Sequence, residues 1–207
     1  MLLESLTLDY VKTGGEMVGS SVLRRLLAKR AEVARGILVD RLAKGKANLK
    51  DLSEDDAAAI IYRYMRAAEE GAARMNLKLL ADVIAGQDAK PGFYANDFLL
   101  WADVLSGLRH EEVVVLGLMH REANKQDYQV AQSGDFWLKC LGLLESERNV
   151  TPGESDNIAA ALLRTGLVSI LSGLYDMGHA YMPSPNLKKL AEMADLEAYY
   201  MEQPHVA

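Results

Sequence analysis

Apolar side chains recur with the spacing of one helical face over residues 53–86, the most extended such pattern in the chain. The positions are Ala57, Ile60, Ile61, Tyr64, Ala68, Ala72, Met75, Leu79, Leu80 and Val83. Ser53 suits a helix N-cap, and the acidic residues after it lie where the helix dipole favours negative charge. Gly86 suits the left-handed residue that often follows a helix. The pattern predicts one long central helix of about 50 Å, at 1.5 Å per residue.

Shorter runs with the same spacing predict further helices on both sides of this one. The expected ranges are 16–44, 94–106, 110–123, 134–147, 155–165 and 184–201. Ser155 is the expected N-cap of the fifth, and Ser184 followed by Pro185 gives the last helix the start that helices favour. Residues 1–15 are expected to form an arm or a short strand, and residues 45–52 a polar connection.

Strand-like sequence is confined to a short region near the C-terminal end. Residues 168–171 and 179–182 read as two strands, and the glycines and Asp176 between them predict a turn over 172–178. The expected fold is therefore mainly α. A helical body over 1–148 surrounds the long helix, and a C-terminal unit over 149–207 contains a small β-hairpin.

Two segments of this C-terminal unit carry a family resemblance. The run 162–168 (LLRTGLV), followed by the hairpin and by 181–187 (YMPSPNL), resembles the end of many bacterial winged-helix domains. Those domains often show a leucine–arginine–glycine–leucine–valine helix end, then a tyrosine–x–threonine–proline strand and a final helix. This chain has Ser184-Pro185 where threonine–proline is usual. The resemblance covers roughly the last 40–50 residues, the size of one supersecondary unit, and implies a winged-helix-like fold with 155–165 as its recognition helix.

The order of the predicted elements resembles a second group, the Abi-alpha type of bacterial proteins associated with abortive phage infection. In that group a helical body with a leucine–x–x–glutamate–glutamate helix start precedes a winged-helix-like tail. Here Leu108-Arg109-His110-Glu111-Glu112 stands in that place. The resemblance implies a role in phage defence.

Composition narrows the class of protein. Half of the residues are apolar and a quarter are charged, as in an ordinary globular domain able to bury a core. No apolar run approaches the length of a membrane span, and the N-terminus lacks the pattern of a signal peptide. The single Cys140 excludes an intrachain disulfide and a cysteine-based zinc site. A cytoplasmic location is the expectation.

The net charge of −6 hides a strong local asymmetry. Residues 20–50 contain nine basic residues and two acidic ones, which is +7 for this segment and −13 for the rest of the chain. The basic residues are Arg24, Arg25, Lys29, Arg30, Arg35, Arg41, Lys44, Lys46 and Lys50. These side chains are candidates for binding nucleic acid or an anionic membrane surface. The alternative is a solvated helix whose cations pair with acidic parts of this chain or of a second subunit.

The remaining candidates for chemistry are weaker. Arg164 is the one cation on the predicted recognition helix, which also carries Asp156 and follows Glu154, so acidic groups oppose a phosphate backbone there. The two histidines of the 110–123 helix are ten residues apart, about 15 Å along the axis, and cannot share a metal ion. Cys140 lies on an apolar stripe and is expected to be a buried, inert thiol. Arg74 and Asn76 lie among small residues and are expected to specify packing.

The sequence therefore predicts a non-enzymatic cytoplasmic interaction protein that acts through protein contacts and self-association as a homo-oligomer. Phage defence is the process that the resemblance implies. The alternatives are a winged-helix DNA-binding transcriptional regulator and a peripheral membrane protein that docks through residues 20–50. No catalytic motif, metal site, cofactor or small-molecule substrate is predicted.

Overall fold

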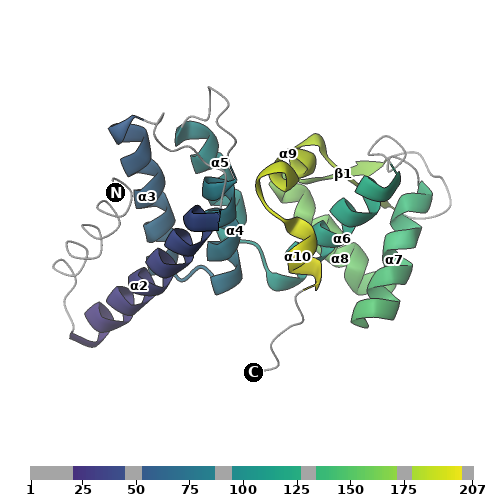
Figure 1. The fold of residues 1–207 in the computed structure, drawn as a ribbon. Helices are drawn as coiled ribbons and strands as arrows, with labels where there is room; N and C mark the ends of the chain where they lie inside the picture. Colours follow the sequence, from purple (N-terminus) through teal and green to yellow (C-terminus); the bar gives the residue numbers. More distant parts are fainter. Residues whose placement is uncertain (1–20, 45–52, 87–94, 127–133, 172–178, 202–207) are drawn as a thin grey trace. The chain divides into compact units, whose positions relative to one another are not determined.

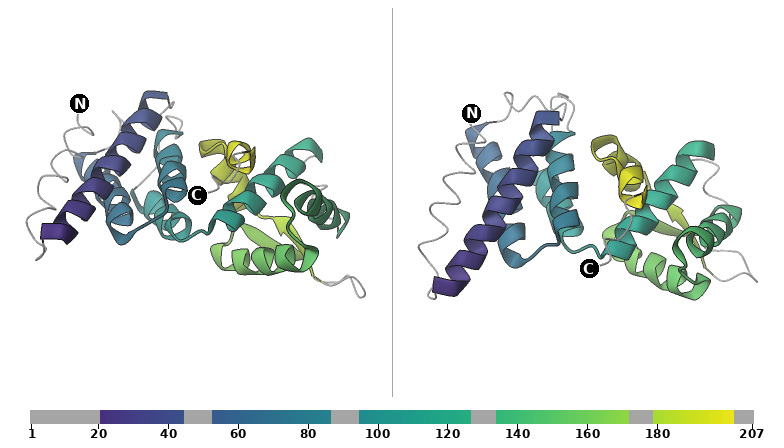
Figure 2. Two further views of the ribbon diagram at one scale, coloured as in Figure 1. Left: turned by 90° about the horizontal axis from the view of Figure 1, so that it is seen from below. Right: turned by 60° about the horizontal axis from the view of Figure 1, so that its bottom comes forward.

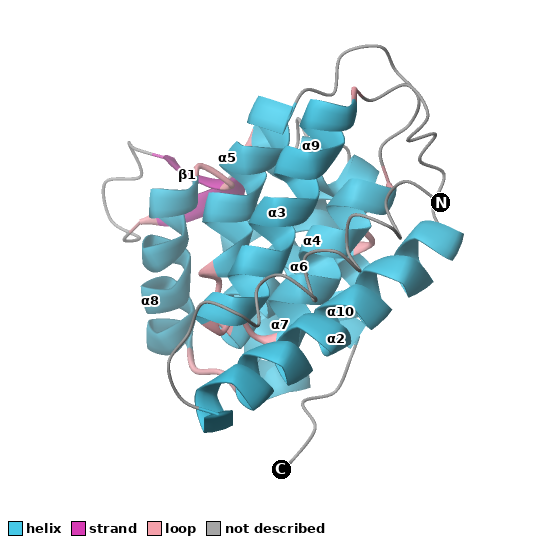
Figure 3. Ribbon diagram, turned by 90° about the vertical axis from the view of Figure 1, so that its left-hand side faces the viewer, coloured by secondary structure: helices cyan, strands magenta, loops and turns pink. Residues whose placement is uncertain are grey.

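The structure is a computed structural model that describes residues 21–44, 53–86, 95–126, 134–171 and 179–201. Its described residues are mainly helical and include one two-stranded antiparallel sheet (Figure 1; Figure 3). The chain forms two compact units, unit 1 (Met1–Leu108) and unit 2 (Arg109–Ala207). The predicted fold class, mainly α with a small hairpin near the C-terminal end, is confirmed at this level.

Unit 1 is built from helices that bury one face each. The described helices are α2 (Ser21–Lys44), α3 (Glu54–Glu70), α4 (Arg74–Ala85) and α5 (Ala95–Ser106). α2 packs against α3 and α4, and both of these pack against α5. Ala31 and Ala34 are buried on the side of α2 that packs in unit 1. The hydroxyl of Tyr64 in α3 donates to the backbone carbonyl of Ala34 at 2.9 Å, so this buried polar group is satisfied.

The predicted single helix over 53–86 is wrong, because the chain breaks at Gly71. This glycine follows α3 with φ 97°, a left-handed conformation that costs glycine least. Its N–H donates to Ala68 at 3.2 Å and the N–H of Ala72 donates to Ala67 at 2.9 Å, the bond pair of a Schellman motif. The apolar face continues across the break because both helices bury it, so the periodicity alone did not reveal two helices.

The predicted ends of this region have different outcomes. Ser53 caps α3 as expected, since its hydroxyl accepts the N–H of Asp56 at 3.1 Å. Gly86 follows α4 as expected, but its φ is −85°, so the predicted left-handed conformation is wrong. The N–H of Gly86 instead donates to the carbonyl of Asp82 at 2.7 Å, which continues the helical pattern.

Unit 2 is arranged around α6, a helix that is buried along most of its length. The elements are α6 (His110–Gln126), α7 (Gly134–Arg148), α8 (Pro152–Leu162), a 3-10 turn (Leu163–Thr165), β1 (Val168–Leu171), β2 (Ala180–Pro183), α9 (Pro185–Met193) and α10 (Leu196–Met201). α6 contacts α7, α8, β2, α9 and α10 (Figure 1). α6 therefore has in unit 2 the central position that the sequence suggested for the 53–86 helix.

The predicted hairpin is confirmed in its two strands. β1 pairs with β2 in antiparallel register, with Val168 opposite Pro183 and Leu171 opposite Ala180. The ring of Tyr181 in β2 meets the ring of Trp137 in α7 edge-on, with centroids 5.2 Å apart. This contact attaches the hairpin to the helices. The predicted turn over 172–178 lies outside the described residues.

The helix predicted over 155–165 starts earlier and ends earlier than expected. Thr151 is the N-cap of α8, Pro152 is its first residue, and Thr151 and Glu154 form a reciprocal capping box. The signal was present in the sequence as Thr-x-x-Glu with a proline at the first helical position. Ser155, predicted as the cap, is instead a buried residue within the helix.

The helix predicted over 184–201 is divided into α9 and α10. Its start is confirmed, since the Ser184 hydroxyl accepts the N–H groups of Asn186 and Leu187. Ala194 is extended, and the carboxylate of Asp195 accepts the N–H of Ala198 at 3.1 Å to begin a new helix. The apolar spacing continues from α9 into α10 because both helices pack against α6.

Helix α10 lies close against α6 at one glycine. A Cβ placed on Gly117 would lie 2.5 Å from the carbonyl oxygen of Leu196 and 3.0 Å from Cβ of Tyr200. Gly117 therefore permits a backbone approach that any other residue would prevent.

The compact units divide the chain at a different place from the predicted domains, 1–148 and 149–207. α6 and α7 pack against α8 and β2, so residues 109–148 belong to the same compact unit as the hairpin. The predicted boundary between residues 148 and 149 is a statement about which parts of the chain fold on their own, and it stays a prediction. The predicted N-terminal arm over 1–15 and the connection over 45–52 lie outside the described residues.

Candidate functional site

Those cations predicted to bind an anion that the structure describes lie in four environments: the C-terminal end of α2, its middle, its first turns and the end of α8. Lys46 and Lys50 lie outside the described residues. At the C-terminal end of α2, Arg41 Nε lies 3.2 Å from a carboxylate oxygen of Asp82, and Lys44 Nζ lies 2.7 Å from Asp40. These two cations are neutralised within unit 1.

Arg30 and Arg35 occupy the middle of α2. Arg30 Nη1 donates to the carbonyl of Glu69 at 3.1 Å, in the last turn of α3, and the same guanidinium lies against Gly71. It satisfies a carbonyl that the helix end leaves without an intrahelical partner. Arg35 is half-buried, and its Nε is a buried atom without a hydrogen-bond partner in the described part of the chain. Arg30 thus has a structural function.

The first turns of α2 differ from the rest of the helix. Leu23, Arg24, Arg25, Leu26 and Lys29 are all exposed, and we call these five residues the α2 overhang. In both views of Figure 2 this purple end of α2 extends beyond the other helices of unit 1. Leu23 and Leu26 are 42% and 54% exposed, so two apolar side chains lie at the surface beside the three cations. Among the described residues, the three cations of the overhang form no ion pair.

Arg164 has the opposite environment. Its guanidinium binds both carboxylate oxygens of Glu112, with Nη1 2.6 Å from one oxygen and Nη2 2.9 Å from the other. Glu112 is fully buried and also accepts the backbone N–H of Arg109 at 2.8 Å. Burial raises the pKa of Glu112, but the hydrogen bonds from Arg164 and Arg109 outweigh it, so the pKa lies below its usual value. Arg164 therefore joins α6 to the end of α8.

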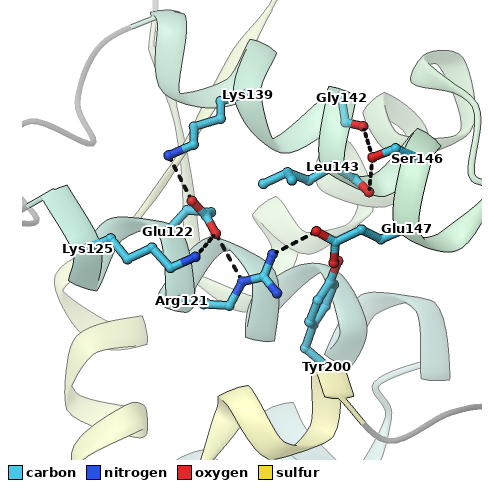
Figure 4. Close-up of polar contacts among 9 residues, drawn as sticks. All are labelled: Arg121, Glu122, Lys125, Lys139, Gly142, Leu143, Ser146, Glu147 and Tyr200. Atoms are coloured by element: carbon cyan, nitrogen blue, oxygen red, sulfur yellow. Dashed lines mark hydrogen bonds and ion pairs between the residues drawn. The ribbon is translucent and has the colours of Figure 1, made fainter.

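A second buried carboxylate, Glu122, collects three cations in unit 2 (Figure 4). Lys125 Nζ lies at 2.8 Å, Lys139 Nζ at 2.9 Å and Arg121 Nε at 3.0 Å. The Glu122 side chain is 2% exposed. Burial raises its pKa, but the hydrogen bonds from Lys125 and Lys139 outweigh it and lower the pKa to about 2. Glu122 remains ionised and attaches α7 to α6.

The same network reaches α10 through Arg121. Arg121 Nη2 lies 3.4 Å from a carboxylate oxygen of Glu147, and the Tyr200 hydroxyl donates to the other oxygen at 2.7 Å (Figure 4). The guanidinium of Arg121 stands 4.4 Å from the centre of the Tyr200 ring, and that of Arg148 stands at 4.7 Å. These are cation–π distances. The network joins α6, α7 and α10. We interpret it as a set of contacts that hold these helices together and not as a binding site.

The other candidate residues support structural functions. Asn76 Nδ2 donates to the carbonyls of Ser106 and Leu108 at 3.0 and 2.8 Å, at the end of α5, which agrees with its predicted packing function. Cys140 is buried, and burial raises the pKa of its thiol to about 12, so at neutral pH it is protonated and a poor nucleophile. The described residues contain no group of histidine, cysteine and carboxylate side chains able to hold a metal ion.

Sequence reasoning missed both buried carboxylates. Glu112 stands three residues after Arg109 at a helix start, a spacing typical of a capping residue. Glu122 stands three residues before Lys125, a spacing typical of an exposed helical ion pair. Neither pattern indicates burial, because the other cations, Lys139 and Arg164, come from α7 and from the 3-10 turn after α8.

The chain matches no known family model, no curated protein sequence and no solved structure. Both family resemblances therefore stay predictions. Within the described residues, every helix is too short or too polar to cross a lipid bilayer.

Proposed function

We propose that this protein acts by binding a negatively charged partner rather than by catalysing a reaction, and that the α2 overhang is the binding surface. The observation that supports the proposal is the exposure of Arg24, Arg25 and Lys29 without an ion pair among the described residues. Arg30, Arg41 and Arg164 each have a partner within their own unit.

Charge distribution gives the overhang a physical reason to bind an anion. Unit 1 has fifteen basic and fifteen acidic residues, so its positive end is a local property and not a result of net charge. Three like charges within about two helical turns repel one another. A bound anion removes this repulsion, which favours contact of the overhang with phosphate or carboxylate groups.

A polyanionic resin tests the proposal. The whole chain should bind a sulfated polysaccharide resin at low salt and elute as salt screens the charges. The triple variant Arg24→Gln, Arg25→Gln, Lys29→Gln should elute at a clearly lower salt concentration. The control is the double variant Lys188→Gln, Lys189→Gln, which removes exposed cations from α9 in unit 2. The same loss of retention in both variants would show that net charge matters and the overhang does not.

A winged-helix assignment of unit 2 is part of the proposal for the fold. The order of α6, α7 and α8 followed by β1 and β2 supports it, because winged-helix domains place a hairpin after three helices. DNA binding through α8 has less support. Arg164 is bound to Glu112, Glu154 belongs to the capping box, and unit 2 has fourteen acidic and eight basic residues. Phosphate contacts need exposed cations, so we favour unit 2 as a packing or protein-binding unit.

Self-association through protein contacts is a further part of the proposal. Outside the overhang, Leu100 on α5 is 69% exposed and Tyr62 on α3 is 54% exposed, and we propose these two side chains as candidates for a contact between subunits, where aromatic residues are enriched. Sedimentation equilibrium should show a mass that rises with concentration, and Leu100→Ser should shift the equilibrium towards the monomer. A monomer at all concentrations would contradict this part.

A role in phage defence rests on the Abi-alpha resemblance. Expression in a bacterial host should lower the efficiency of plaque formation by at least one phage, and the triple glutamine variant of the overhang should restore it. Unchanged plaque counts across a broad phage panel would remove this expectation. The binding proposal does not depend on this outcome.

A further inference from the structure

We infer that the partner of the α2 overhang is an anionic membrane surface, with Leu23 and Leu26 inserted among the lipids and Arg24, Arg25 and Lys29 on the lipid phosphates. This inference rests on the proposed function and specifies its partner. The overhang is exposed, cationic and apolar at once, a combination typical of helices that lie in the interface of a bilayer.

The helical geometry separates apolar and cationic side chains around the overhang. At 100° per residue, Leu23 and Leu26 project about 60° apart and form one narrow apolar sector. Lys29 lies about 60° beyond Leu26 on one side, and Arg24 lies about 100° beyond Leu23 on the other. The apolar sector therefore has a cation on each flank. Long basic side chains in that position can extend to phosphate groups while the leucines enter the apolar layer.

Nucleic acid fits this surface less well. Its affinity comes from phosphate contacts with cations, and the overhang would supply these. The two leucines would have no matching apolar surface on a phosphate backbone. A lipid interface accepts both kinds of side chain.

A protein partner is disfavoured by size. Residues 23–29 span about 10 Å of one helix, whereas a stable protein interface buries about 800 Å² on each partner. Five side chains supply only part of that area. A membrane needs no matching shape, and each basic residue near an anionic bilayer strengthens binding by about fivefold.

The experiment is co-sedimentation of the whole chain with vesicles. One set is phosphatidylcholine alone, and the other contains about 30% phosphatidylglycerol, an anionic lipid. We expect binding to the second set, loss of that binding at high salt, and little binding to the first. Arg24→Gln with Arg25→Gln should weaken it by about 25-fold, and Leu26→Ser by several-fold. These side chains are exposed, so the variants should keep the wild-type circular dichroism spectrum.

Matched controls separate the overhang from general effects. Lys188→Gln with Lys189→Gln removes the same amount of charge from α9, and Leu138→Ser removes a leucine that is 44% exposed on α7. Both should stay within about twofold of the wild type, as expected for surface changes away from the contact. Equal losses in test and control variants would overturn the inference.

Other outcomes identify a different partner. Absence of vesicle binding, with retention on the polyanionic resin still dependent on the overhang, overturns the membrane inference and leaves the proposed function standing. Tight binding of duplex DNA that needs Arg24 and Arg25 but not Leu26, without vesicle binding, assigns nucleic acid instead. A dimer that Leu26→Ser dissociates, without vesicle binding, assigns a second copy of the chain. Failure of both the resin and the vesicle experiments overturns both proposals.

Discussion

Arg24 in unit 1 and Arg164 in unit 2 were both predicted to contact an anion, and the structure places them in opposite environments. Arg164 binds the two oxygens of the buried Glu112, which forms an anion site inside the protein. Both arginines are exposed, the Arg164 side chain by 50%, but Arg24 forms no ion pair with a described residue. The difference does not come from the arginines themselves. It comes from whether a carboxylate on another helix is buried beside them.

The comparison extends to the stability of the two units. In unit 2, Glu112 binds Arg164 from the 3-10 turn after α8 and Arg109 just before α6, and Glu122 binds Lys139 from α7, so ion pairs connect its elements. In unit 1, the overhang cations form no ion pair with a described residue, while Arg30 and Arg41 join α2 to α3 and α4. A buried charge that loses its partner is costly, whereas an exposed one is nearly free to change. Loss of an ion pair to a buried carboxylate should therefore lower the free energy of unfolding, whereas substitution of an exposed cation of the overhang should leave it nearly unchanged.

The largest effect is expected at Glu122. Glu122→Ala removes a buried carboxylate that binds Arg121 and two lysines, while Arg121 keeps Glu147, and should lower the free energy of unfolding by about 3 kcal/mol. Urea denaturation followed by Trp137 fluorescence in a Trp101→Phe background measures it. Glu145→Ala, at an exposed position on the neighbouring helix α7, should change this free energy by less than about 0.5 kcal/mol. Equal effects at the two positions would contradict a buried ionic network.

Acid should weaken unit 2 through the same carboxylate. The folded-state pKa of Glu122 is about 2, below its usual value near 4.5, so the stabilisation is complete above about pH 4.5 and is lost as pH falls towards 2. The pKa difference corresponds to about 3 kcal/mol. Urea titrations between neutral pH and pH 2.5 should show this loss, and Glu122→Gln should flatten the profile. An equally steep profile in the variant would show that other groups cause it.

A smaller effect is expected where α10 meets α6. Gly117→Ala places a methyl group against the Leu196 carbonyl and should destabilise unit 2 by about 2 kcal/mol. Gly142→Ala on α7 has no atom within 4 Å of the new methyl group and should stabilise by up to about 1 kcal/mol. A lower melting temperature for Gly117→Ala and a higher one for Gly142→Ala would support the close approach of α10 to α6. A neutral Gly117→Ala would show that α10 moves freely.

The smallest effect on stability is expected in the α2 overhang. Replacing Arg24, Arg25 and Lys29 by glutamine should change the free energy of unfolding by less than about 0.5 kcal/mol, because exposed charges contribute little. The same variant should lose most of its retention on the polyanionic resin. A loss above 1 kcal/mol would mean that these cations are structural, and would remove the contrast with Arg164.

Most of the elements could be predicted from local patterns. The N-caps Ser53 and Ser184, the two strands and the helices α5, α6 and α7 follow from apolar spacing and cap chemistry that involve neighbouring residues. The breaks at Gly71 and Ala194 were missed because the apolar face continues across each. The start of α8 was missed although Thr151 and Glu154 carried its signal.

The amino-acid sequence by itself determined the helical character, the place of the hairpin and the concentration of cations in residues 20–50. Each of these depends on residues close together in the chain. The tertiary structure decided which cations have a carboxylate partner. Arg164, Lys139 and Arg41 meet Glu112, Glu122 and Asp82 only when segments distant in the chain pack together. It also showed that the overhang of α2 extends past α3 and α4 (Figure 2). Exposure depends on where neighbouring helices end, and a pattern within one helix does not contain that information.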